Sequence, residues 1–377
     1  MLIVFWLSLF LIVHPYITYP LALRAWAVVR RRSVRRAAIE PSISVLVPAY
    51  NEVEVIAATL EALLAQDYPK DKLQIVVVSD CSSDGTDDVV RSYADRGVEL
   101  LRQADRGGKA LGLNAAVKQA RGDVLVFCDA NARFRPGALR SMAQNFADPS
   151  VGYVTGQLML ESAGAVTSGG GAYLRFEEWL RAAETEVASV IGVNGGCDAI
   201  RRELYSDIPR ELITDFVLPL RVIAAGRRVV FDPQAESRET ANAELQSEFS
   251  MRVRVALRAL QGLMHMRRLL NPLRFPATSF CLVSHKVLRY MAFVFLVTAL
   301  ASNLALAIGS PFYRVLLVLH LLCYLLAACG LLGVGRRTMG MLAVAPAYLL
   351  MSYWAFAVAS WRFVRGQSMA TWKPRSG

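Results

Sequence analysis

Two residues that could hold a charged ligand end an apolar run at 124–131, "VLVFCDAN". Asp129 supplies a carboxylate, and Asn131 supplies a neutral amide oxygen. Hard cations such as Mg²⁺ and Mn²⁺ take oxygen ligands and bridge diphosphates. The pattern therefore predicts Asp129 as a ligand of a divalent cation. Asn131 would bind the metal weakly, bind it through water, or donate a hydrogen bond to a phosphate; an ordinary Asx turn is the alternative for the pair.

Asp80 and Lys109 are further candidates for contact with a nucleotide. Asp80 ends the apolar run "LQIVVVSD", where a carboxylate can accept hydrogen bonds from a base or a ribose. Its alternative role is to cap the next helix, although Ser83 and Asp84 also suit that role. Lys109 lies in "RGGKA" near a predicted helix start and could neutralise phosphate oxygens. The segment lacks the first glycine of a P-loop and the Ser or Thr after the lysine, so a P-loop is not predicted.

These residues would be positioned by alternating strands and helices. Strands are predicted in four runs: "SISVLVPAY", "LQIVVVSD", "VELLRQ" and "DVLVFCDA". Helices are predicted between them, the first capped by Asn51. Continuous β-branched runs alternating with helices predict an α/β fold with a mostly parallel sheet covered on both faces. Ligands bind at the carboxyl ends of such strands, so Tyr50, Asp80 and Asp129 should converge on one crevice. No G-x-G-x-x-G follows the first strand, which argues against a dehydrogenase.

The apolar residues are concentrated outside this soluble block. Hydrophobic residues make up 54% of the 377-residue chain and charged residues 19%. Residues 2–22 carry no charge, and similar stretches occur at about 290–310, 315–334 and 341–361. Each is about 20 residues long, enough to cross a hydrocarbon core of about 30 Å. The sequence therefore predicts an integral membrane protein. The expected parts are an N-terminal transmembrane helix at 1–29, a soluble domain at 40–248, basic amphipathic interfacial helices at 249–289, about three C-terminal transmembrane helices at 290–361 and a basic tail at 362–377.

Basic residues predict how the chain is oriented. Five arginines follow the first span: Arg30, Arg31, Arg32, Arg35 and Arg36. Because basic loops stay in the cytoplasm, we expect a multi-pass protein of a bacterial-type inner (plasma) membrane with its soluble domain in the cytoplasm. Three later crossings would place the basic tail outside. Either one late segment is re-entrant or interfacial, or the charge rule fails for this chain.

Residues 249–290 hold eight Lys or Arg and no acid, within a net charge of +11. Leucine and methionine side chains alternate with these charges, so we expect this segment to lie on the anionic leaflet and contact membrane lipids. A solvated basic face is the alternative, and no nucleic-acid partner is expected because no nucleic-acid-binding motif is present. The six scattered cysteines form no C-x-x-C pair, which is typical of a reduced compartment.

Five segments in order resemble the membrane-bound inverting glycosyltransferases of family 2, the branch that includes cellulose, chitin and hyaluronan synthases. They are "VLVPAYNE", "VVVSDCSSDGT", "RGGKALGLNAA", "VFCDAN" and "ITDFVLPLRVIAAGRRVVFDP". The resemblance covers about 42–290, and the flanking apolar stretches match the layout of that branch. It implies a GT-A (Rossmann-like) domain flanked by transmembrane helices, a nucleotide-sugar donor such as a UDP-sugar, and Mg²⁺ or Mn²⁺.

The resemblance assigns roles to particular residues. Pro48, Tyr50 and Glu52 would line the nucleoside pocket, and Asp80 would hold the base or ribose. Asp129 and Asn131 stand at the two acids of the family's D-x-D. Asp215 stands at the general base, although Thr214 replaces the acid that precedes it in the family. On the acceptor or diphosphate side the resemblance places Asn194, Gly195, Arg252 and Arg254.

The departures from the family pattern affect the predicted acceptor. In the segment that matches the family's Q-x-x-R-W, Met251 and Val255 replace the Gln and the Trp, and Arg254 matches the Arg. The tryptophan lies at the acceptor entrance in polymer-making relatives, and four spans are few for a polysaccharide channel. Both points favour the addition of a single sugar to a lipid, lipid-linked or glycan acceptor at the cytoplasmic membrane face.

Other functions remain open at the level of sequence. A processive polysaccharide synthase is the alternative within the family. A nucleotidyltransferase could use a related crevice and metal, but it would not explain the basic segment joined to spans. A catalytically silent nucleotide-sugar-binding membrane protein is a further alternative because Asn131, Thr214, Met251 and Val255 depart from the motifs. The donor sugar and any protein partner are not predicted.

Overall fold

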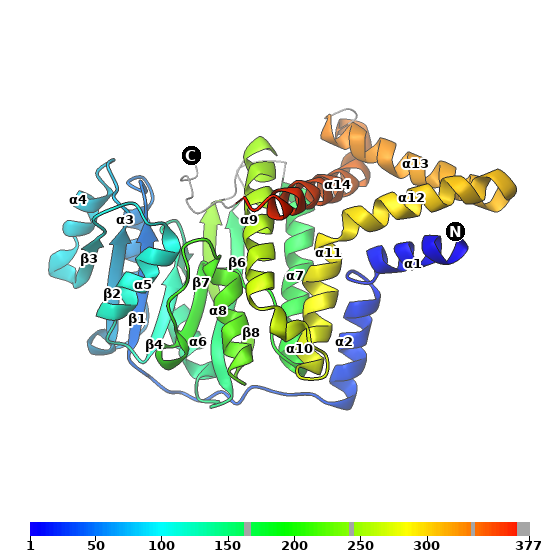
Figure 1. The fold of residues 1–377 in the computed structure, drawn as a ribbon. Helices are drawn as coiled ribbons and strands as arrows, with labels where there is room; N and C mark the ends of the chain where they lie inside the picture. The colour runs from blue at the N-terminus through cyan, green and yellow to red at the C-terminus, as the bar shows by residue number, and fades with distance from the viewer. Residues whose placement is uncertain (162–166, 241–244, 333–335, 368–377) are drawn as a thin grey trace.

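The computed structural model describes residues 1–161, 167–240, 245–332 and 336–367. A single mixed sheet, with strand order β3-β2-β1-β4-β7-β6-β8-β5, forms the centre of the soluble domain. Helices cover both faces of this sheet, and the long C-terminal helices extend away from it on one side (Figure 1).

The first half of the sheet follows the sequence prediction closely. Its strands are β1 (Ile43–Ala49), β2 (Leu73–Ser79), β3 (Val98–Arg102) and β4 (Val124–Cys128). They pair in parallel, with β1 between β2 and β4. The connecting helices are α3 (Ile56–Leu64), α4 (Thr86–Arg91) and α5 (Lys109–Gln119). The α/β prediction is confirmed here, because successive side chains of each strand enter separate hydrophobic clusters on the two faces.

One local prediction in this half is wrong. Asn51 does not cap α3, which begins at Ile56 with Val55 as its N-cap. Instead, Asn51 adopts a left-handed backbone with φ of 53°, a conformation that asparagine tolerates better than most residues. Its Oδ1 accepts a hydrogen bond from Ser83 N at 2.9 Å, and its own N–H donates to Ser82 Oγ at 3.1 Å. Asn51 therefore joins the turn after β1 to the turn after β2.

The second half of the sheet is mixed. Its elements are β5 (Arg133–Phe134), α6 (Ala138–Asn145), β6 (Val151–Glu161), α7 (Thr167–Val187), β7 (Cys197–Arg201), α8 (Thr214–Ala224) and β8 (Arg228–Thr240). β7 is antiparallel to both β4 and β6, β5 is antiparallel to β8, and β6 pairs with β8 in parallel. The prediction of a mostly parallel sheet therefore applies to the first four strands. Short 3₁₀ turns occur at Lys70–Lys72, Ala94–Arg96, Arg202–Leu204 and Arg267–Leu270.

The predicted N-terminal span is divided into two helices. α1 (Leu2–Val13) and α2 (Thr18–Val29) meet at an angle of 62°. The break falls at His14 and Pro15, where the proline ring and its missing N–H prevent a regular helix from continuing. α2 packs against the sheet domain, with Tyr19 and Leu23 fully buried. α1 lies instead beside α12, as Figure 1 shows.

The C-terminal part consists of helices of two kinds. α9 (Leu245–His265), α10 (Pro276–Leu282), a π-helical turn (Val283–Val287) and α11 (Leu288–Tyr290) pack on the soluble domain. α12 (Ala292–Gly309), α13 (Pro311–Leu331) and α14 (Arg336–Val364) follow. Within the described ranges, α12 and α13 are long and apolar enough to cross a membrane, and the bent α1–α2 pair would be a third span. A crossing by α14, and with it the path of the chain ends, stays a prediction.

The interfacial segment needs a correction. Several of its apolar side chains were expected to enter the leaflet, but Leu257 and Leu269 are fully buried inside the protein. Leu257 packs with Val253 against α14, and Leu269 belongs to the core beneath the sheet. Met264 and Leu273 remain exposed, at 51% and 95%. The helical periodicity identified an apolar face correctly, but that face is covered mainly by protein.

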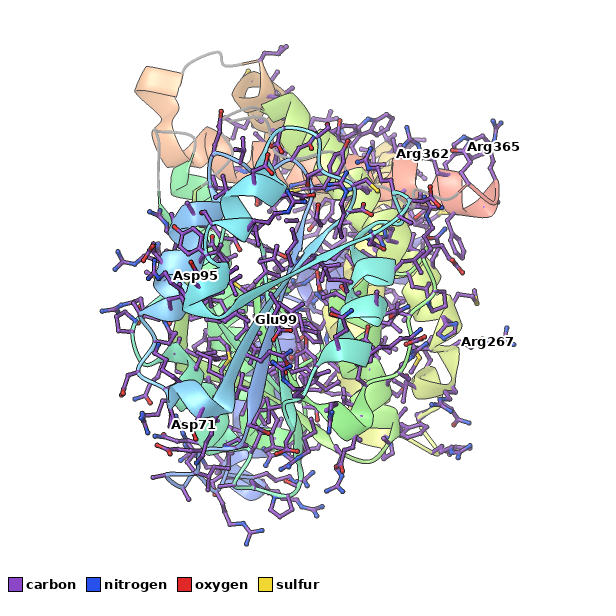
Figure 2. All side chains as sticks on the ribbon, turned by 90° about the vertical axis from the view of Figure 1, so that its left-hand side faces the viewer. Asp71, Asp95, Glu99, Arg267, Arg362 and Arg365 are labelled. Carbon is purple, nitrogen blue, oxygen red and sulfur yellow. The ribbon has the colours of Figure 1, made fainter. Side chains whose placement is uncertain are left out.

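Some exposed charged residues of the two chain halves lie far apart on the surface. Figure 2 shows Arg267, Arg362 and Arg365 on one side of the molecule, on or near the α9 and α14 helices. Asp71, Asp95 and Glu99 lie on the other side, around β2 and β3. Contact of these arginines with anionic lipid headgroups stays a prediction.

Gly122 tests how closely the sheet is packed at the start of β1. A Cβ at this position would lie 2.4 Å from Ser44 N and 2.6 Å from Ile43 C, both backbone atoms that cannot rotate away. We expect Gly122→Ala to destabilise the protein by about 1–3 kcal/mol, the usual cost of overpacking. Thermal unfolding of the detergent-solubilised protein measures this. Gly97→Ala is the control, because nothing lies within 4 Å of its Cβ position and only its positive φ adds strain. Equal melting temperatures for the two variants would contradict the prediction.

Candidate functional site

Lys109 connects the two acids that the sequence singled out for chemistry. Its Nζ donates to Asp129 Oδ1 at 2.7 Å and to the carbonyl oxygen of Gly195 at 3.2 Å, and it lies 3.6 Å from Asp215 Oδ1. Burial alone would lower the pKa of Lys109, but the nearby Asp129 and Asp215 carboxylates outweigh it and raise that pKa. Lys109 is therefore a permanent cation between the two carboxylates.

Gly195 and Gly196 allow the acids to approach. A Cβ on Gly195 would lie 2.3 Å from Asp215 Oδ2, and the residue also has a φ of 88°. A Cβ on Gly196 would lie 2.6 Å from Glu239 Oε1 and 3.2 Å from Asp129 Oδ2. Only glycine fits both constraints at Gly195. The pair thus brings Asp129, Asp215 and Glu239 around one short stretch of backbone.

Asp215 is held at the start of a helix. It lies in the first turn of α8, where the helix dipole stabilises a negative charge. Thr214 Oγ1 donates to Asp215 Oδ1 at 2.8 Å, so the residue that replaces the family's acid orients the remaining one. The Asp215 side chain is 26% exposed, which leaves it accessible from the crevice.

One arginine of α9, Arg258, interacts electrostatically with Asp215, and Arg254 lies near it on the same helix. The sequence predicted Arg254 as a residue of the acceptor or diphosphate side, whereas it did not predict a role for Arg258, one helical turn later. Arg258 donates to the carbonyl oxygen of Leu212 at 2.6 Å, and its Nε is buried without a hydrogen-bond partner among the described residues. Burial lowers the pKa of Arg258, Asp215 opposes this effect, and Arg254 adds to it. The four-residue spacing of the two arginines could have revealed Arg258 in the sequence.

Asp80 organises the loop before α5. Its carboxylate is 4% exposed and accepts hydrogen bonds from Gly107 N at 2.7 Å, from Gly108 N at 3.0 and 3.1 Å, and from Gln103 Nε2 at 2.8 Å. These bonds fix the backbone that leads into Lys109. A contact between Asp80 and a base or ribose stays a prediction.

The other predicted nucleoside residues surround this loop. The Tyr50 ring lies under the Arg106 guanidinium at 3.6 Å, a cation–π contact that fixes the edge of the pocket. Glu52 N donates to Thr86 Oγ1 at 2.9 Å. Pro48 is buried within β1, opposite Val78 of β2. Tyr50 and Glu52 thus lie in the turn that follows β1, as expected for Tyr50 at the end of a strand. Pro48 lies within β1 itself.

Two residues predicted for the acceptor side, Asn194 and Arg252, make their contacts in different parts of the structure. Asn194 belongs to the site loop: its N–H donates to Thr155 Oγ1 at 3.3 Å and its Nδ2 donates to the Gly156 carbonyl at 2.7 Å. Arg252 instead pairs with Glu248 at 2.7 Å and donates to Ser352 Oγ on α14 at 2.9 Å. The observed contacts of Arg252 thus join α9 to α14.

A buried acid that the sequence did not indicate lies behind the site. Asp198 on β7 is fully buried, and its Oδ2 accepts a hydrogen bond from Gly195 N at 2.7 Å. Its Oδ1 is buried without a hydrogen-bond partner in the described chain. Burial raises the pKa of Asp198 to about 7, a hydrogen bond from Thr155 lowers it, and the charge of Asp215 raises it further. Near neutral pH the acid therefore carries a proton part of the time.

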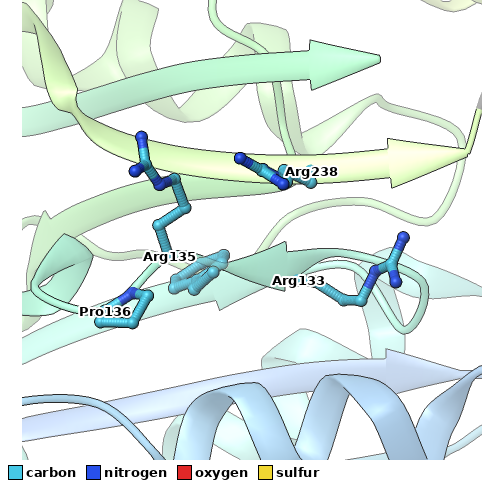
Figure 3. Close-up of a pocket in the computed structure, with 5 residues that line it drawn as sticks. Arg133, Arg135, Pro136 and Arg238 are labelled. Atoms are coloured by element: carbon cyan, nitrogen blue, oxygen red, sulfur yellow. The ribbon is translucent and has the colours of Figure 1, made fainter. Parts of the chain in front are cut away.

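A basic pocket follows the Asp129–Asn131 corner in the chain. It has a volume of about 300 Å³ and is lined by Arg133, Phe134, Arg135, Pro136 and Arg238. Figure 3 shows three guanidinium groups around it. Arg133 and Arg238 are directly opposite each other in the β5–β8 pair, and Arg135 forms an ion pair with Glu236 at 2.6 Å.

The site residues can be tested for their fit to a divalent cation. Among the residues with described positions, no three His, Cys, Asp or Glu side chains form a ready metal site. Mg²⁺ and similar ions are commonly held by one or two carboxylates together with substrate phosphates and water. Asp129, 36% exposed, and the buried Glu239 both lie next to Gly196 and provide such carboxylates. The residues present therefore fit a metal that arrives with a diphosphate.

The sheet order, the acid at the end of β4 and the base candidate at the start of α8 define the class: a GT-A-type nucleotide-sugar fold. Residues 44–208 match the family model described as glycosyl transferase family 2. This segment of the chain is therefore similar to that family. The match is to the family as a whole, and the branch within it stays a prediction.

Individual relatives agree with this assignment. The chain is 30% identical over 213 residues to the probable glycosyltransferase YdaM of Bacillus subtilis (strain 168), which covers 52% of this chain and 50% of that protein. It is 35% identical over 102 residues to the poly(ribitol-phosphate) beta-N-acetylglucosaminyltransferase TarS of Staphylococcus aureus (strain Mu50 / ATCC 700699), covering 26% and 18%. This chain thus spans half or less of the length of these curated relatives.

A solved structure shares the fold over nearly the whole chain. The mannosyltransferase PcManGT from Pyrobaculum calidifontis, in complex with GDP-Man and Mn²⁺, superposes with a TM-score of 0.72 at 23% identity. The match covers 97% of this chain and 99% of that one. The arrangement of helices around the sheet is therefore one that occurs in a solved protein.

Asp198 gives a pH prediction. Its folded pKa of about 7 exceeds the ordinary value of 3.8, so the folded state favours the protonated acid. The stability that this preference provides is complete below about pH 4 and is lost as the pH rises through 7. We expect Asp198→Asn, which keeps an acceptor for Gly195 N, to raise the melting temperature more at pH 8 than at pH 5. Asp207→Asn serves as the control. The same change in melting temperature at both pH values would contradict the prediction.

Proposed function

We propose that the protein is an inverting, metal-dependent glycosyltransferase that moves a sugar from a nucleotide-sugar donor to a lipid, lipid-linked or glycan acceptor at the cytoplasmic membrane face. The observation that carries the proposal is the cluster of Lys109, Asp129 and Asp215 around Gly195. It combines a cation and a carboxylate suited to a diphosphate with a second, accessible carboxylate suited to proton transfer. The family match supports the same reaction class.

Asp215 acts as the general base in this proposal. Its carboxylate would accept the proton of the acceptor hydroxyl while C1 of the donor sugar is attacked from the face opposite the diphosphate. One attack from the opposite face inverts the anomeric configuration. Thr214 and the start of α8 orient the carboxylate for this task. Protonation of the buried Asp198 reduces the negative charge next to the base.

The diphosphate side consists of Asp129, Asn131 and Lys109, with Arg254 from α9. A divalent cation bound here through Asp129, with Asn131 or Glu239 near it, would supply positive charge to the departing diphosphate. Lys109 holds the Asp129 carboxylate in place and adds a permanent positive charge. PcManGT, which shares the fold, was solved with a nucleotide-sugar and Mn²⁺, ligands of the classes proposed here.

The position equivalent to the family's gatekeeper tryptophan favours a single addition. Val255 is 42% exposed on α9, so no large aromatic ring is available at this place to hold a growing polymer. The processive synthase is therefore the second choice. The helices that follow α9 lead directly into α12 and α13, which would bring the site close to a membrane-bound acceptor.

The deciding experiment measures nucleotide release from a panel of UDP- and GDP-sugars by the full chain in detergent. We expect metal-dependent release of UDP or GDP, increased by an added lipid extract. Release of pyrophosphate would instead indicate a nucleotidyltransferase. Binding of a nucleotide-sugar without hydrolysis or transfer under any of these conditions would indicate a silent binding protein and reject the proposal.

Asp215→Asn tests the general base. The change keeps the size and the hydrogen bond from Thr214 but removes basicity. We expect turnover to fall by about 10² or more, the usual contribution of a general base, while donor affinity is retained. Steady-state kinetics and a donor titration measure the two quantities separately. Glu211→Gln, an exposed acid in the preceding loop, is the control. Unchanged turnover in Asp215→Asn would remove Asp215 from the mechanism.

Asp129 and Asn131 should respond unequally to substitution. Asp129→Ala should abolish manganese-dependent UDP binding because the carboxylate supplies the charge that holds a hard cation. Asn131→Ala should raise the manganese requirement and leave measurable binding, and Asn131→Asp should lower it by adding an anionic oxygen. The three variants and the parent are compared by titrating each with manganese and measuring UDP binding during the titration. If Asp129→Ala binds UDP and manganese like the parent, the corner at 129–131 is only a turn.

A further inference from the structure

A second cluster of charged residues lies outside the site, between α7 and the segment that leads into the first C-terminal span. Glu177, Arg181 and Glu184 occupy one face of α7. His285, at 0% exposure, lies in the π-helical turn, and Arg289, at 5%, lies in α11. π-helical turns are rare and are frequent at functional sites.

The carboxylates of this cluster have their partners within the protein. Glu184 Oε1 accepts from Tyr19 Oη at 2.7 Å and faces His285 Nδ1 at 2.6 Å, and its Oε2 accepts from Ile191 N at 3.0 Å. Glu177 faces His285 Nε2 at 3.2 Å and forms an ion pair with Arg289. The two acids are therefore saturated by groups that hold α2, α7 and α11 together.

The cations of the cluster are not saturated in the same way. Arg181 uses its Nε to donate to the Gly192 carbonyl at 2.8 Å, but its Nη1 is buried without a partner in the described part of the chain. Arg289 donates from Nη1 to Tyr173 Oη at 3.2 Å and lies over the Tyr16 ring at 5.0 Å, but its Nε and Nη2 are buried without hydrogen-bond partners there. Arg181 and Arg289 are only 6% and 5% exposed, so these donors have little contact with bulk solvent. Buried donors of this kind cost free energy unless a ligand accepts from them.

Lys286 completes the group. Its Nζ lies 2.5 Å from the position of a Cβ on Gly192, so Arg181 and Lys286 both contact this glycine. No ion pair or hydrogen bond joins the Lys286 amine to another residue of the described ranges, and the side chain is only half-buried. Burial lowers the pKa of Lys286 to about 8, an effect that Glu177 opposes and Arg289 and Arg181 reinforce. One further acid, Glu178, lies near Arg181, but it accepts from Gln157 at 3.3 Å, and burial raises its pKa.

The position of these cations between the site loop and the first apolar helix indicates the kind of ligand that they would bind. Gly192 begins the loop that reaches Gly195, which contacts Asp215, so the cations are joined to the base side of the site rather than to the Asp80 side. Lys286 and Arg289 also immediately precede α12, the first apolar helix long enough to cross a membrane. An anion bound here would therefore lie next to the loop that reaches Gly195 and close in the chain to the start of α12.

We propose that Arg181, Lys286 and Arg289 form a binding site for the phosphate group of a lipid phosphate that serves as the acceptor. This assignment rests on the proposed glycosyltransferase function and specifies its acceptor class. The phosphate oxygens would accept from the unpartnered guanidinium and ammonium donors, which form strong charge-assisted hydrogen bonds. The acyl or prenyl chain would extend toward α12.

The test uses calorimetric titration of the full chain in detergent with farnesyl phosphate, farnesol and inorganic phosphate. We expect farnesyl phosphate to bind at least about tenfold more tightly than either other probe, because one lacks the anion and the other the chain. Lys286→Met should weaken farnesyl phosphate binding about tenfold or more and leave manganese-dependent UDP binding unchanged. Lys286→Arg should restore most of the affinity. Lys118→Met, which removes an exposed lysine of α5, is the matched control and should bind like the parent.

A second variant changes the site without removing a charge. Gly192→Ala would displace the Lys286 amine, whose flexible chain can move aside, so we expect weaker farnesyl phosphate binding with a folded protein. Unchanged farnesyl phosphate affinity in Lys286→Met would overturn the proposal. The proposal would also be overturned if this variant had a lower melting temperature and lost UDP binding as much as farnesyl phosphate binding. Inorganic phosphate binding as tightly as farnesyl phosphate would replace the lipid by a soluble phosphate and also overturn it. A different outcome separates the two proposals. If farnesyl phosphate binds as expected but no nucleotide is released from any donor, only the glycosyltransferase function is rejected.

Discussion

The contact of Lys109 with Asp129 and Asp215 is the interaction on which the site depends. Two carboxylates placed near each other would repel, and the positive charge of the lysine between them makes their approach favourable. The three residues come from the start of α5, the end of β4 and the start of α8, so a single ammonium group joins elements that are far apart in the sequence. The Gly195 carbonyl, which also accepts from Lys109, adds the loop before β7. The Asp80 loop leads into Lys109, and the two adjacent glycines make room for Asp129 and Asp215.

The first half of the fold could be predicted because its signals are local. A run such as "LQIVVVSD" is buried on both faces and ends in a polar residue, which is sufficient to predict a parallel strand and a crevice at its end. The placement of Asp129 followed from that rule, and Lys109 was placed by the predicted start of the helix before β4. The family pattern placed Asp215, and the structure brings it within 3.6 Å of Lys109.

The remaining features depend on contacts between distant residues, which a local pattern does not contain. The antiparallel position of β7 is set by its pairing with both neighbours, and this pairing brings Asp198 into the interior. Asp80 was expected to face a ligand, but the backbone donors at Gly107 and Gly108 lie near enough to occupy its oxygens. Leu257 and Leu269 had the periodicity of a membrane-facing helix, and protein covers them instead. Hydrophobic periodicity identifies an apolar face but does not distinguish lipid from protein as the surroundings of that face.

The pairing of β4 with β7 also determines when the site can form during synthesis. Cys128 of β4 pairs with Cys197 of β7, so this contact joins residues much farther apart in the sequence than the pairing of Ile43 in β1 with Leu73 in β2, and loop closure over the longer distance is slower. A nascent chain that has folded only through β4 has the Lys109–Asp129 pair but neither Gly195 nor Asp215. The half that carries the phosphate-side groups can therefore fold first as a unit, while the residue proposed to activate the acceptor joins it only after β7 and α8 have emerged. The order of elements along the chain thus delays the assembly of a complete site until most of the soluble domain has been made.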